Sequence, residues 1–329
     1  MEYRQLGSSP VRASVVTFGA WAIGGWMWGG ADEDDAIEAI RTSLDLGVTS
    51  IDTAPIYGYG KSEELVGRAI AGRRDEAQIL TKFCLRWDEE AGEHFFDMSE
   101  GGKTVRIFRN ARRASILKEC EDSLRRLGTD RIDLYQCHWR DHTTPVEETI
   151  EACNELLQAG KTRAIGVSNF NVEEIETARR TGPLASNQPP YSMLNRGIEK
   201  DILPYCREHN IAILAYSPLH GGLLTGKFQP GHTFRPGDHR AGDPLYSPES
   251  IARVNAFLDR LRPIANGYGA TLSQLVVRWT VQQPGLTVAL VGARDAAQAR
   301  ENAGATDFRI SDADMATIAA LLQDLNPAP

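Results

Sequence analysis

Short apolar runs alternate along this chain with amphipathic segments whose apolar residues recur every three or four positions. The apolar runs have the length of buried strands, and the amphipathic segments have the length and period of helices. Strands are therefore predicted at residues 15–21, 49–54, 78–83, 132–139, 162–168, 184–188, 211–217 and 286–292, and helices at residues 34–46, 62–71, 115–127, 145–158, 172–179, 198–208, 248–268 and 295–303. This alternation predicts an α/β fold, a closed (β/α)8 or TIM barrel, formed as one domain over residues 1–329.

Three features fall outside the repeat. Residues 3–13 predict an N-terminal β-hairpin that could plug the bottom of the barrel, and residues 312–322 predict a closing helix. Two long connections, at residues 85–114 and 220–247, are rich in Gly, Pro and charge. Both follow strands, so we expect long loops at the carboxyl-terminal face, where barrel enzymes carry their active sites.

Charge and composition narrow the class of partner. The 329 residues include 36 Lys and Arg and 44 Asp and Glu, interspersed along the chain, for a formal net charge of −8. We expect neither a nucleic-acid surface nor a membrane surface, and a small molecule is the expected partner. A cluster of arginines is interpreted as a solvated face without function, with an anion site as the alternative; it comprises Arg106, Arg109, Arg112 and Arg113.

The five cysteines include no C-x-x-C pair and predict neither a disulfide framework nor a zinc site. No other metal-ligand spacing is present, so no metal is expected. Residues 15–30 are apolar but broken by glycine and lack a basic leader, which is not the pattern of a signal peptide. Together these features favour a protein of the reducing cytoplasm.

Ionisable residues stand at the carboxyl ends of three consecutive predicted strands: Asp52, Lys82 and His138. Burying an unpaired charge is costly, so Lys82 and Asp52 are expected to pair. Tyr57 leaves the same strand end as Asp52, and its hydroxyl could reach the Lys82 ammonium. The ammonium would lower the pKa of the phenol and equip it as a general acid, although a lone Tyr is more often a packed side chain.

Longer motifs give these residues a context. The chain resembles the aldo-keto reductase family from about residue 3 to residue 322, and is similar to its bacterial general-stress and inositol-cluster branch and to potassium-channel β subunits. The motifs that carry this resemblance are Ile51-Asp52-Thr53-Ala54-Pro55-Ile56-Tyr57-Gly58, Leu80-Thr81-Lys82, Ile132-Asp133-Leu134-Tyr135-Gln136-Cys137-His138-Trp139, Ile165-Gly166-Val167-Ser168-Asn169-Phe170, Asn187-Gln188, Ala215-Tyr216-Ser217-Pro218-Leu219 and Leu223-Leu224-Thr225-Gly226-Lys227.

The resemblance implies an NADPH-dependent reduction of aldehydes or ketones to alcohols. In that family a hydride passes from the nicotinamide to the carbonyl carbon while a tyrosine, here Tyr57, gives the oxygen its proton. Lys82, paired with Asp52, would assist Tyr57, and His138 would orient the carbonyl. These four residues form the expected catalytic set.

The expected cofactor site is also implied by the resemblance, because no G-x-G-x-x-G follows the first strand. Ser168, Asn169 and Gln188 would hold the carboxamide, and Tyr216 would stack on the nicotinamide. The residues expected around the pyrophosphate are Ser217, Leu219, Gly222, Leu223, Gly226 and Lys227. Those expected at the adenosine end are Gly292, Arg294, Gln298, Glu301 and Asn302. The other residues expected to contact the cofactor are Gly19, Ala20, Trp21 and Asp52. Arg294 favours NADPH, while Gly292 and Gln298 depart from the better-known branch and leave the strength of that preference open.

Aromatic residues at strand ends suggest the substrate pocket. Trp21, Phe83 and Trp139 are expected to wall it beside Tyr57 and His138, and an aromatic or aliphatic aldehyde would fit. The alternative for the aromatic residues is a place in the core.

Two other functions stay open at this point. Lys82 could instead form a Schiff base, as in an aldolase. Alternatively, the chain could be a cofactor-binding redox sensor with slow turnover, as the resemblance to channel subunits allows. The sequence does not specify the natural substrate, the favoured direction of reaction or the oligomeric state.

Overall fold

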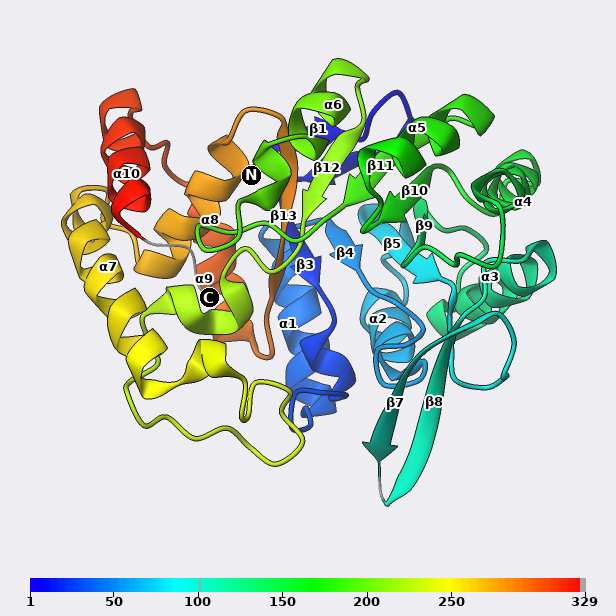
Figure 1. The fold of residues 1–329 in the computed structure, drawn as a ribbon, viewed down its shortest axis with the longest axis horizontal. Helices are drawn as coiled ribbons and strands as arrows, with labels where there is room; N and C mark the ends of the chain where they lie inside the picture. Colours follow the sequence, from blue (N-terminus) through cyan, green and yellow to red (C-terminus); the bar gives the residue numbers. More distant parts are fainter. Residues whose placement is uncertain (101, 326–329) are drawn as a thin grey trace.

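The computed structural model describes residues 1–100 and 102–325. At its centre eight parallel strands close into a barrel in the order β10-β11-β12-β13-β3-β4-β5-β9 (Figure 1). The strands are β3 (Val16–Gly19), β4 (Ser50–Asp52), β5 (Gln78–Phe83), β9 (Leu134–Cys137), β10 (Ile165–Ser168), β11 (Leu184–Gln188), β12 (Ala212–Ala215) and β13 (Leu286–Gly292). The predicted barrel and its eight strands are confirmed.

Helices surround the barrel because their apolar stripes pack on the outward-facing residues of the strands. The barrel helices are α1 (Glu33–Asp45), α2 (Lys61–Ile70), α3 (Arg113–Leu127), α4 (Val146–Gln158), α5 (Val172–Thr181), α6 (Ile202–Glu208), α8 (Leu272–Gln282) and α9 (Ala296–Ala303). In α1, for example, Ala36, Ile37, Ile40 and Leu44 are buried at helical spacing, and the Asp32 side chain caps its first turn by accepting from Asp35 N. Short 3-10 helices are η1 (Ala22–Gly24), η2 (Arg74–Glu76), η3 (Gly197–Glu199) and η6 (Gly304–Thr306).

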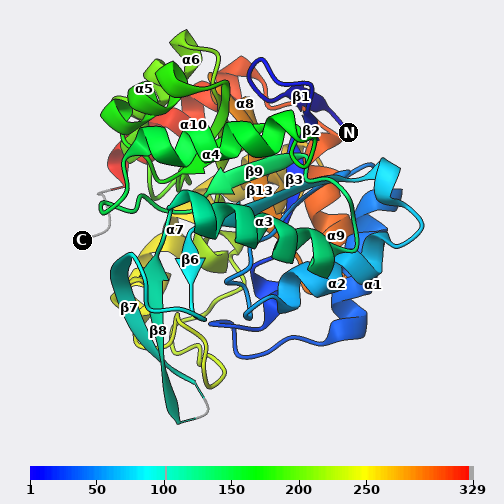
Figure 2. The same ribbon diagram turned by 90° about the vertical axis from the view of Figure 1, so that its right-hand side faces the viewer.

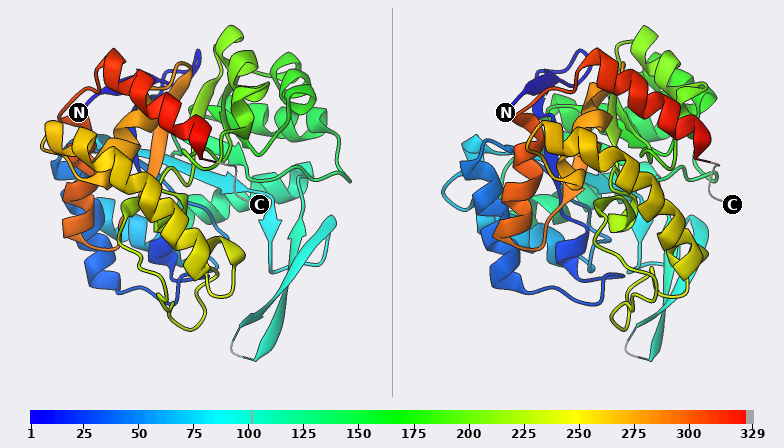
Figure 3. Two further views of the ribbon diagram at one scale, coloured as in Figure 1. Left: turned by 60° about the vertical axis from the view of Figure 1, so that its left-hand side comes forward. Right: turned by 90° about the vertical axis from the view of Figure 1, so that its left-hand side faces the viewer.

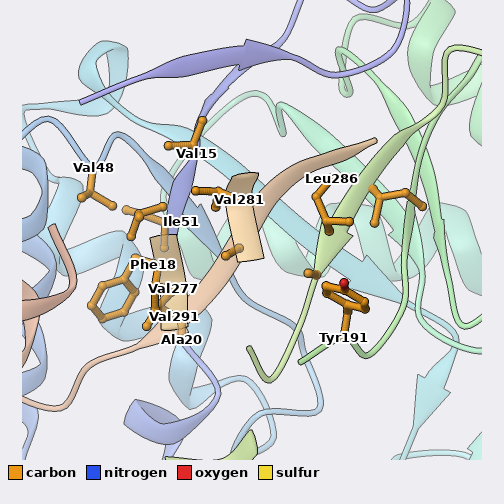
Figure 4. Packing of buried hydrophobic residues seen from close by; sticks show 14 of the residues in the cluster. Val15, Phe18, Ala20, Val48, Ile51, Tyr191, Val277, Val281, Leu286 and Val291 are labelled. Carbon is orange, nitrogen blue, oxygen red and sulfur yellow. The ribbon is translucent and has the colours of Figure 1, made fainter. Parts of the chain in front are cut away.

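The helix that covers β13 was missed by the sequence prediction. The predicted helix at residues 248–268 exists as α7 (Pro248–Gly267), but α8 is the one that packs against β13. Val277 of α8 belongs to the same buried cluster as Phe18 and Val291, and Figure 4 labels all three. Helix α7 lies further out, with α10 (Asp312–Asp324) beside it (Figure 3).

An N-terminal hairpin closes the bottom of the barrel, as predicted. It consists of β1 (Tyr3–Gln5) and β2 (Arg12–Ser14), and Leu6, Val11 and Ala13 pack against residues from the barrel interior. Gly7 has φ +55°, and a Cβ there would lie 2.7 Å from the carbonyl oxygen of Ala185. The turn therefore requires glycine both for its backbone angle and for its close approach to β11.

The connection at residues 85–114, predicted as a loop, contains a small sheet. It is made of β6 (Leu85–Arg86), β7 (Glu93–Glu100) and β8 (Lys103–Arg109) in the order β6-β8-β7. The hairpin of β7 and β8 projects from the barrel mouth (Figures 1 and 2). Three of the clustered arginines form ion pairs here with acidic side chains: Arg106 with Glu90, Arg109 with Glu93, and Arg113 with Glu155.

The connection at residues 220–247 crosses the mouth, and we call it the strap. It contains η4 (His220–Thr225) and η5 (Pro244–Tyr246). Asp238 forms a β-bridge with Trp28, and His239 N donates to Met27 O at 2.9 Å. The strap is thus anchored on the loop that follows β3. Among the described residues, no helix has the length and apolar character needed to span a bilayer.

Candidate active site

A buried ion pair lies at the floor of the barrel mouth. Lys82 Nζ donates to Asp52 Oδ1 at 2.6 Å and to Thr53 O at 3.0 Å, and the Lys82 side chain is fully buried. The alternation of β5 explains the placement, since Leu80 and Lys82 face the barrel interior while Phe83 faces the helices. Burial lowers the pKa of Lys82, but the Asp52 carboxylate and Tyr57 outweigh it and leave that pKa above its usual value.

Two amides complete the floor. Asp52 Oδ2 accepts from Gln188 Nε2 at 2.9 Å and from Gln136 Nε2 at 3.3 Å. Gly166 makes room for this arrangement, because a Cβ there would lie 2.9 Å from Cγ of Gln136. The carboxylate is therefore held on both oxygens. Gln136 had no assigned role in the sequence analysis, although a glutamine inside an apolar strand is the kind of signal that marks such a position.

Tyr57 reaches the same ammonium from above. Its Oη lies 3.3 Å from Lys82 Nζ, and its ring centroid lies 5.8 Å from that of His138. Burial is the largest influence and raises the pKa of Tyr57; Lys82 lowers it and Asp52 raises it, so the net pKa is above 10.0. The expectation that Lys82 leaves Tyr57 with a lowered pKa is thus wrong for this structure, because desolvation of the phenolate exceeds the attraction of the ammonium.

His138 follows β9 and lies in the cavity wall. Burial, and then the nearby Lys82 charge, hold the pKa of His138 well below 6.5. The imidazole is therefore neutral at physiological pH. Asn169 Nδ2 donates to the carbonyl oxygen of His138 at 3.1 Å, which ties the ends of β9 and β10 together.

These residues open into a cavity of about 610 Å³. Most of the residues expected to bind cofactor or substrate line it: Gly19, Ala20, Trp21, Asp52, Tyr57, His138, Trp139, Ser168, Asn169, Gln188, Tyr216, Ser217, Leu219, Gly222, Lys227, Gly292, Arg294, Gln298, Glu301 and Asn302. Lys82 lies beneath the lining and contacts the lining residues Tyr57 and Asp52.

Besides Lys82, three expected site residues lie outside the cavity lining. Phe83 packs under the helices with its ring centroid 4.7 Å from that of Tyr135, because its parity on β5 is opposite to that of Lys82. Leu223 is buried in the outer core, and Gly226 ends η4 with its α-carbon facing Leu272. The expectation that Phe83 walls the pocket is therefore wrong, whereas the pyrophosphate contacts expected of Leu223 and Gly226 stay predictions.

Other lining residues were missed as site residues: Ala22, Trp26, Met27, Trp28, Ile56, Leu85, Phe95, Phe96, Pro218, Gly221, Thr225, Phe228, Arg240, Ser273, Leu290 and Val291. Many belong to the loop after β3, the β7–β8 hairpin and the strap. Only the apolar, aromatic character of these segments hinted at a wall, since loop conformations carry no strong period in the sequence.

The cavity runs from the floor towards the start of α9. Near the floor, Tyr216 Oη donates to Asn169 Oδ1 at 3.0 Å, and Ser168 Oγ donates to Gln188 O at 2.8 Å. Asn169 and Ser217 both have positive φ, +62° and +55°, so each strand end turns sharply where it meets the cavity. This end offers amide and hydroxyl groups beside an aromatic ring.

The far end carries cations. The Trp28 ring contacts two guanidinium groups, with Arg240 at 4.5 Å and Arg294 at 5.4 Å from the ring centroid. Lys227 pairs with Glu301 at 2.9 Å. Amides at one end and cations at the other suit an elongated ligand that has a carboxamide head and phosphate groups.

Comparison with known proteins agrees with this arrangement. The family model described as the aldo/keto reductase family matches residues 15–323. Aldo-keto reductase YhdN of Bacillus subtilis (strain 168) is 42% identical over 327 residues, covering 98% of this chain and 94% of that protein. The NADH-specific methylglyoxal reductase of Escherichia coli (strain K12) is 36% identical over 315 residues, covering 94% of each.

Solved structures give the same answer. The glycerol dehydrogenase AKR11B4 from Gluconobacter oxydans has a TM-score of 0.88 at 40% identity, covering 99% of this chain and 96% of that chain. An aldo/keto reductase from Klebsiella pneumoniae, solved in complex with NADP and acetate, has a TM-score of 0.70 at 31% identity, covering 97% and 93%. The chain therefore belongs to the aldo/keto reductase family and is an NAD(P)H-dependent oxidoreductase.

Proposed function

We propose that this protein reduces aldehyde or ketone carbonyls to alcohols with NADPH, using Tyr57 as the general acid. The observation that carries the proposal is the chain of contacts from Asp52 through Lys82 to the Tyr57 hydroxyl, at 2.6 Å and 3.3 Å, at the floor of the cavity. A phenol in contact with a buried ammonium can give up a proton where negative charge develops on a carbonyl oxygen.

The four residues of the proposed catalytic set have distinct tasks. The raised pKa keeps Tyr57 protonated and ready to donate. Lys82 stabilises the phenolate that remains after donation, and Asp52 keeps Lys82 charged and in place. His138, neutral and 5.8 Å from Tyr57 between ring centroids, orients the carbonyl oxygen by a hydrogen bond.

The donors that line the cavity fit a dinucleotide. When bound, the reduced nicotinamide supplies the hydride. Ser168, Asn169 and Gln188 would hold its carboxamide and Tyr216 its ring face, while the backbone of the strap and Lys227 would lie along the pyrophosphate. Arg294 would meet a 2′-phosphate, and it favours NADPH although one relative is described as NADH-specific.

The contacts of Lys82 argue against a Schiff-base mechanism. Its ammonium donates to Asp52, Thr53 and Tyr57, and its raised pKa keeps it protonated, whereas a nucleophilic amine must be neutral. A slow redox sensor would share the cofactor site and differ in turnover. We propose a small-molecule carbonyl as the partner, and the cytoplasm as the location because all five cysteines are free and buried.

Tyr57→Phe tests the mechanism. We expect the dissociation constant for NADPH to stay nearly unchanged while kcat falls by orders of magnitude, because the variant loses the proton donor and little else. The measurements are NADPH binding by fluorescence and NADPH consumption with a panel of aldehydes. Tyr59→Phe, two residues along the same loop and outside the cavity lining, is the matched control and should retain most of the activity. Full activity in Tyr57→Phe would refute the role of Tyr57.

A further inference from the structure

The strand β7 contains a bulge at the cavity wall. Its pairing with β8 steps from His94 opposite Phe108 to Phe96 opposite Ile107, so Phe95 is an extra residue. On a regular strand Phe95 and Phe96 would face opposite sides of the sheet. Because of the bulge, both line the cavity.

The ring of the bulged residue Phe95 contacts two aromatic rings and a guanidinium group. Its ring centroid lies 5.4 Å from that of Trp139 and 5.0 Å from that of Phe96. The Arg109 guanidinium lies 4.4 Å from the Phe95 ring centroid and pairs with Glu93 at 2.7 Å. The wall is therefore a positioned aromatic surface.

Charge is distributed unequally along the cavity. The lining near Tyr57 and His138 is apolar or uncharged: Trp21, Trp26, Met27, Ile56, Leu85, Phe95, Phe96 and Trp139. The charged lining side chains among the described residues are Asp52, which is paired at the floor, and a group at the nucleotide end: Lys227, Arg240, Arg294 and Glu301. Arg109 stands behind Phe95, where its Nη2 pairs with Glu93 while its buried Nε has no hydrogen-bond partner among the described residues.

We propose that the β7–β8 hairpin is the specificity element of this enzyme, and that it selects carbonyl substrates with an aromatic or extended apolar tail. This inference rests on the proposed function. An apolar tail gains by leaving water for this wall, whereas a hydroxylated or anionic tail would lose hydration among mostly apolar side chains. This preference would differ from the substrates after which two relatives are named, glycerol and methylglyoxal.

The test compares aldehydes that differ in their tails. For the wild type we expect kcat/KM for 3-phenylpropanal to exceed that for glyceraldehyde and for succinic semialdehyde by at least about tenfold. Phe95→Ala and Phe96→Ala should each reduce this ratio several-fold while the NADPH dissociation constant is unchanged. Phe108→Ala removes a phenylalanine of the same hairpin that is outside the cavity lining, and should keep the wild-type ratio.

A variant that gains activity distinguishes a change in specificity from a loss caused by misfolding. Phe96→Arg places a cation in the wall and should raise kcat/KM for succinic semialdehyde relative to 3-phenylpropanal, a change that loss of structure cannot produce. Equal use of 3-phenylpropanal and glyceraldehyde by the wild type would overturn the inference and leave the reductase standing.

Ligand binding separates this inference from the proposed function. Calorimetry measures the dissociation constants of 3-phenylpropan-1-ol and glycerol for the complex of the protein with NADP⁺. These constants show whether the aromatic wall favours an apolar tail, and they do not depend on turnover. If no aldehyde is reduced, tighter binding of the aromatic alcohol would still support the wall while refuting the reductase; equal or weaker binding would overturn the wall as well.

Discussion

Glu119, on α3, supports the end of β5 from behind. Its carboxylate accepts from Cys84 N at 3.1 Å and from Ser115 Oγ at 3.0 Å, and Arg86 lies 4.0 Å away. Cys84 has φ +92°, so this carboxylate fixes the turn two residues beyond Lys82. Burial raises the pKa of Glu119 to about 8, although Arg86 and the two hydrogen bonds act in the opposite direction.

The raised pKa predicts a pH-dependent stability. Between about pH 5 and pH 8 the unfolded chain has released this proton and the folded protein retains it, so the free energy of unfolding should fall as pH rises, by about 1.4 kcal/mol per pH unit from this group. Urea unfolding of wild type and Glu119→Gln at several pH values measures the difference in slope. Parallel slopes for the two proteins would show that Glu119 titrates normally.

The charged residues of the proposed catalytic set were predictable because a charge in an apolar run has few structural explanations. Asp52 and Lys82 stood out for that reason, and the structure pairs them. Consecutive residues of a strand face opposite sides, so Phe83 faces the helices if Lys82 faces the barrel interior. The expectation that Phe83 lines the pocket did not take this alternation into account. The net pKa of Tyr57 was not predictable, since it depends on how deeply the side chain is desolvated.

At the scale of elements, Arg240 joins the parts of the strap. It donates to Asp238 Oδ2 at 2.6 Å and to Gly221 O at 2.8 Å, and its guanidinium lies 4.5 Å from the Trp28 ring centroid. These contacts tie both ends of the strap to the loop after β3. If the nucleotide binds beneath the strap as proposed, we expect it to leave only when these contacts open.

Arg240→Met should therefore accelerate both association and dissociation of NADPH, with dissociation faster by about tenfold. Stopped-flow fluorescence measures both rates. Arg235→Met, at an exposed arginine of the same strap, is the control and should behave as wild type. A slower association with unchanged dissociation would instead indicate that Arg240 attracts the phosphates and does not hold the strap.

Helices and strands with a clear periodicity of apolar residues were mostly predicted, whereas segments whose conformation depends on tertiary contacts were not. The helix α8 was missed although Thr271 and Gln274 form a capping box at its start. The sequence predicts a loop where the β7–β8 hairpin lies, although Gly101-Gly102 stands between two segments with apolar residues. The strap has little regular structure, so its path over the mouth depends on contacts such as that of Asp238 with Trp28.

At the scale of the molecule, the barrel followed from counting the alternating units. Closure needs every strand to be paired on both sides, and eight runs of suitable length meet that requirement. The site also follows from the architecture, since the carboxyl ends of parallel strands gather Asp52, Lys82 and His138 at one mouth. The shape of the cavity does not follow from the barrel architecture, because loops outside the repeat build most of its wall.

The bulge at Phe95 also bears on how copies of the chain behave towards each other. The barrel has no free edge, but β7 is an outer strand of its small sheet, so one side of its backbone has no partner strand there. A bulge interrupts such an edge and so discourages strand-by-strand aggregation. Deleting Phe95 alone should regularise β7, and light scattering at increasing concentration should then detect self-association that the wild type lacks; equal scattering would show that the bulge has no such protective effect.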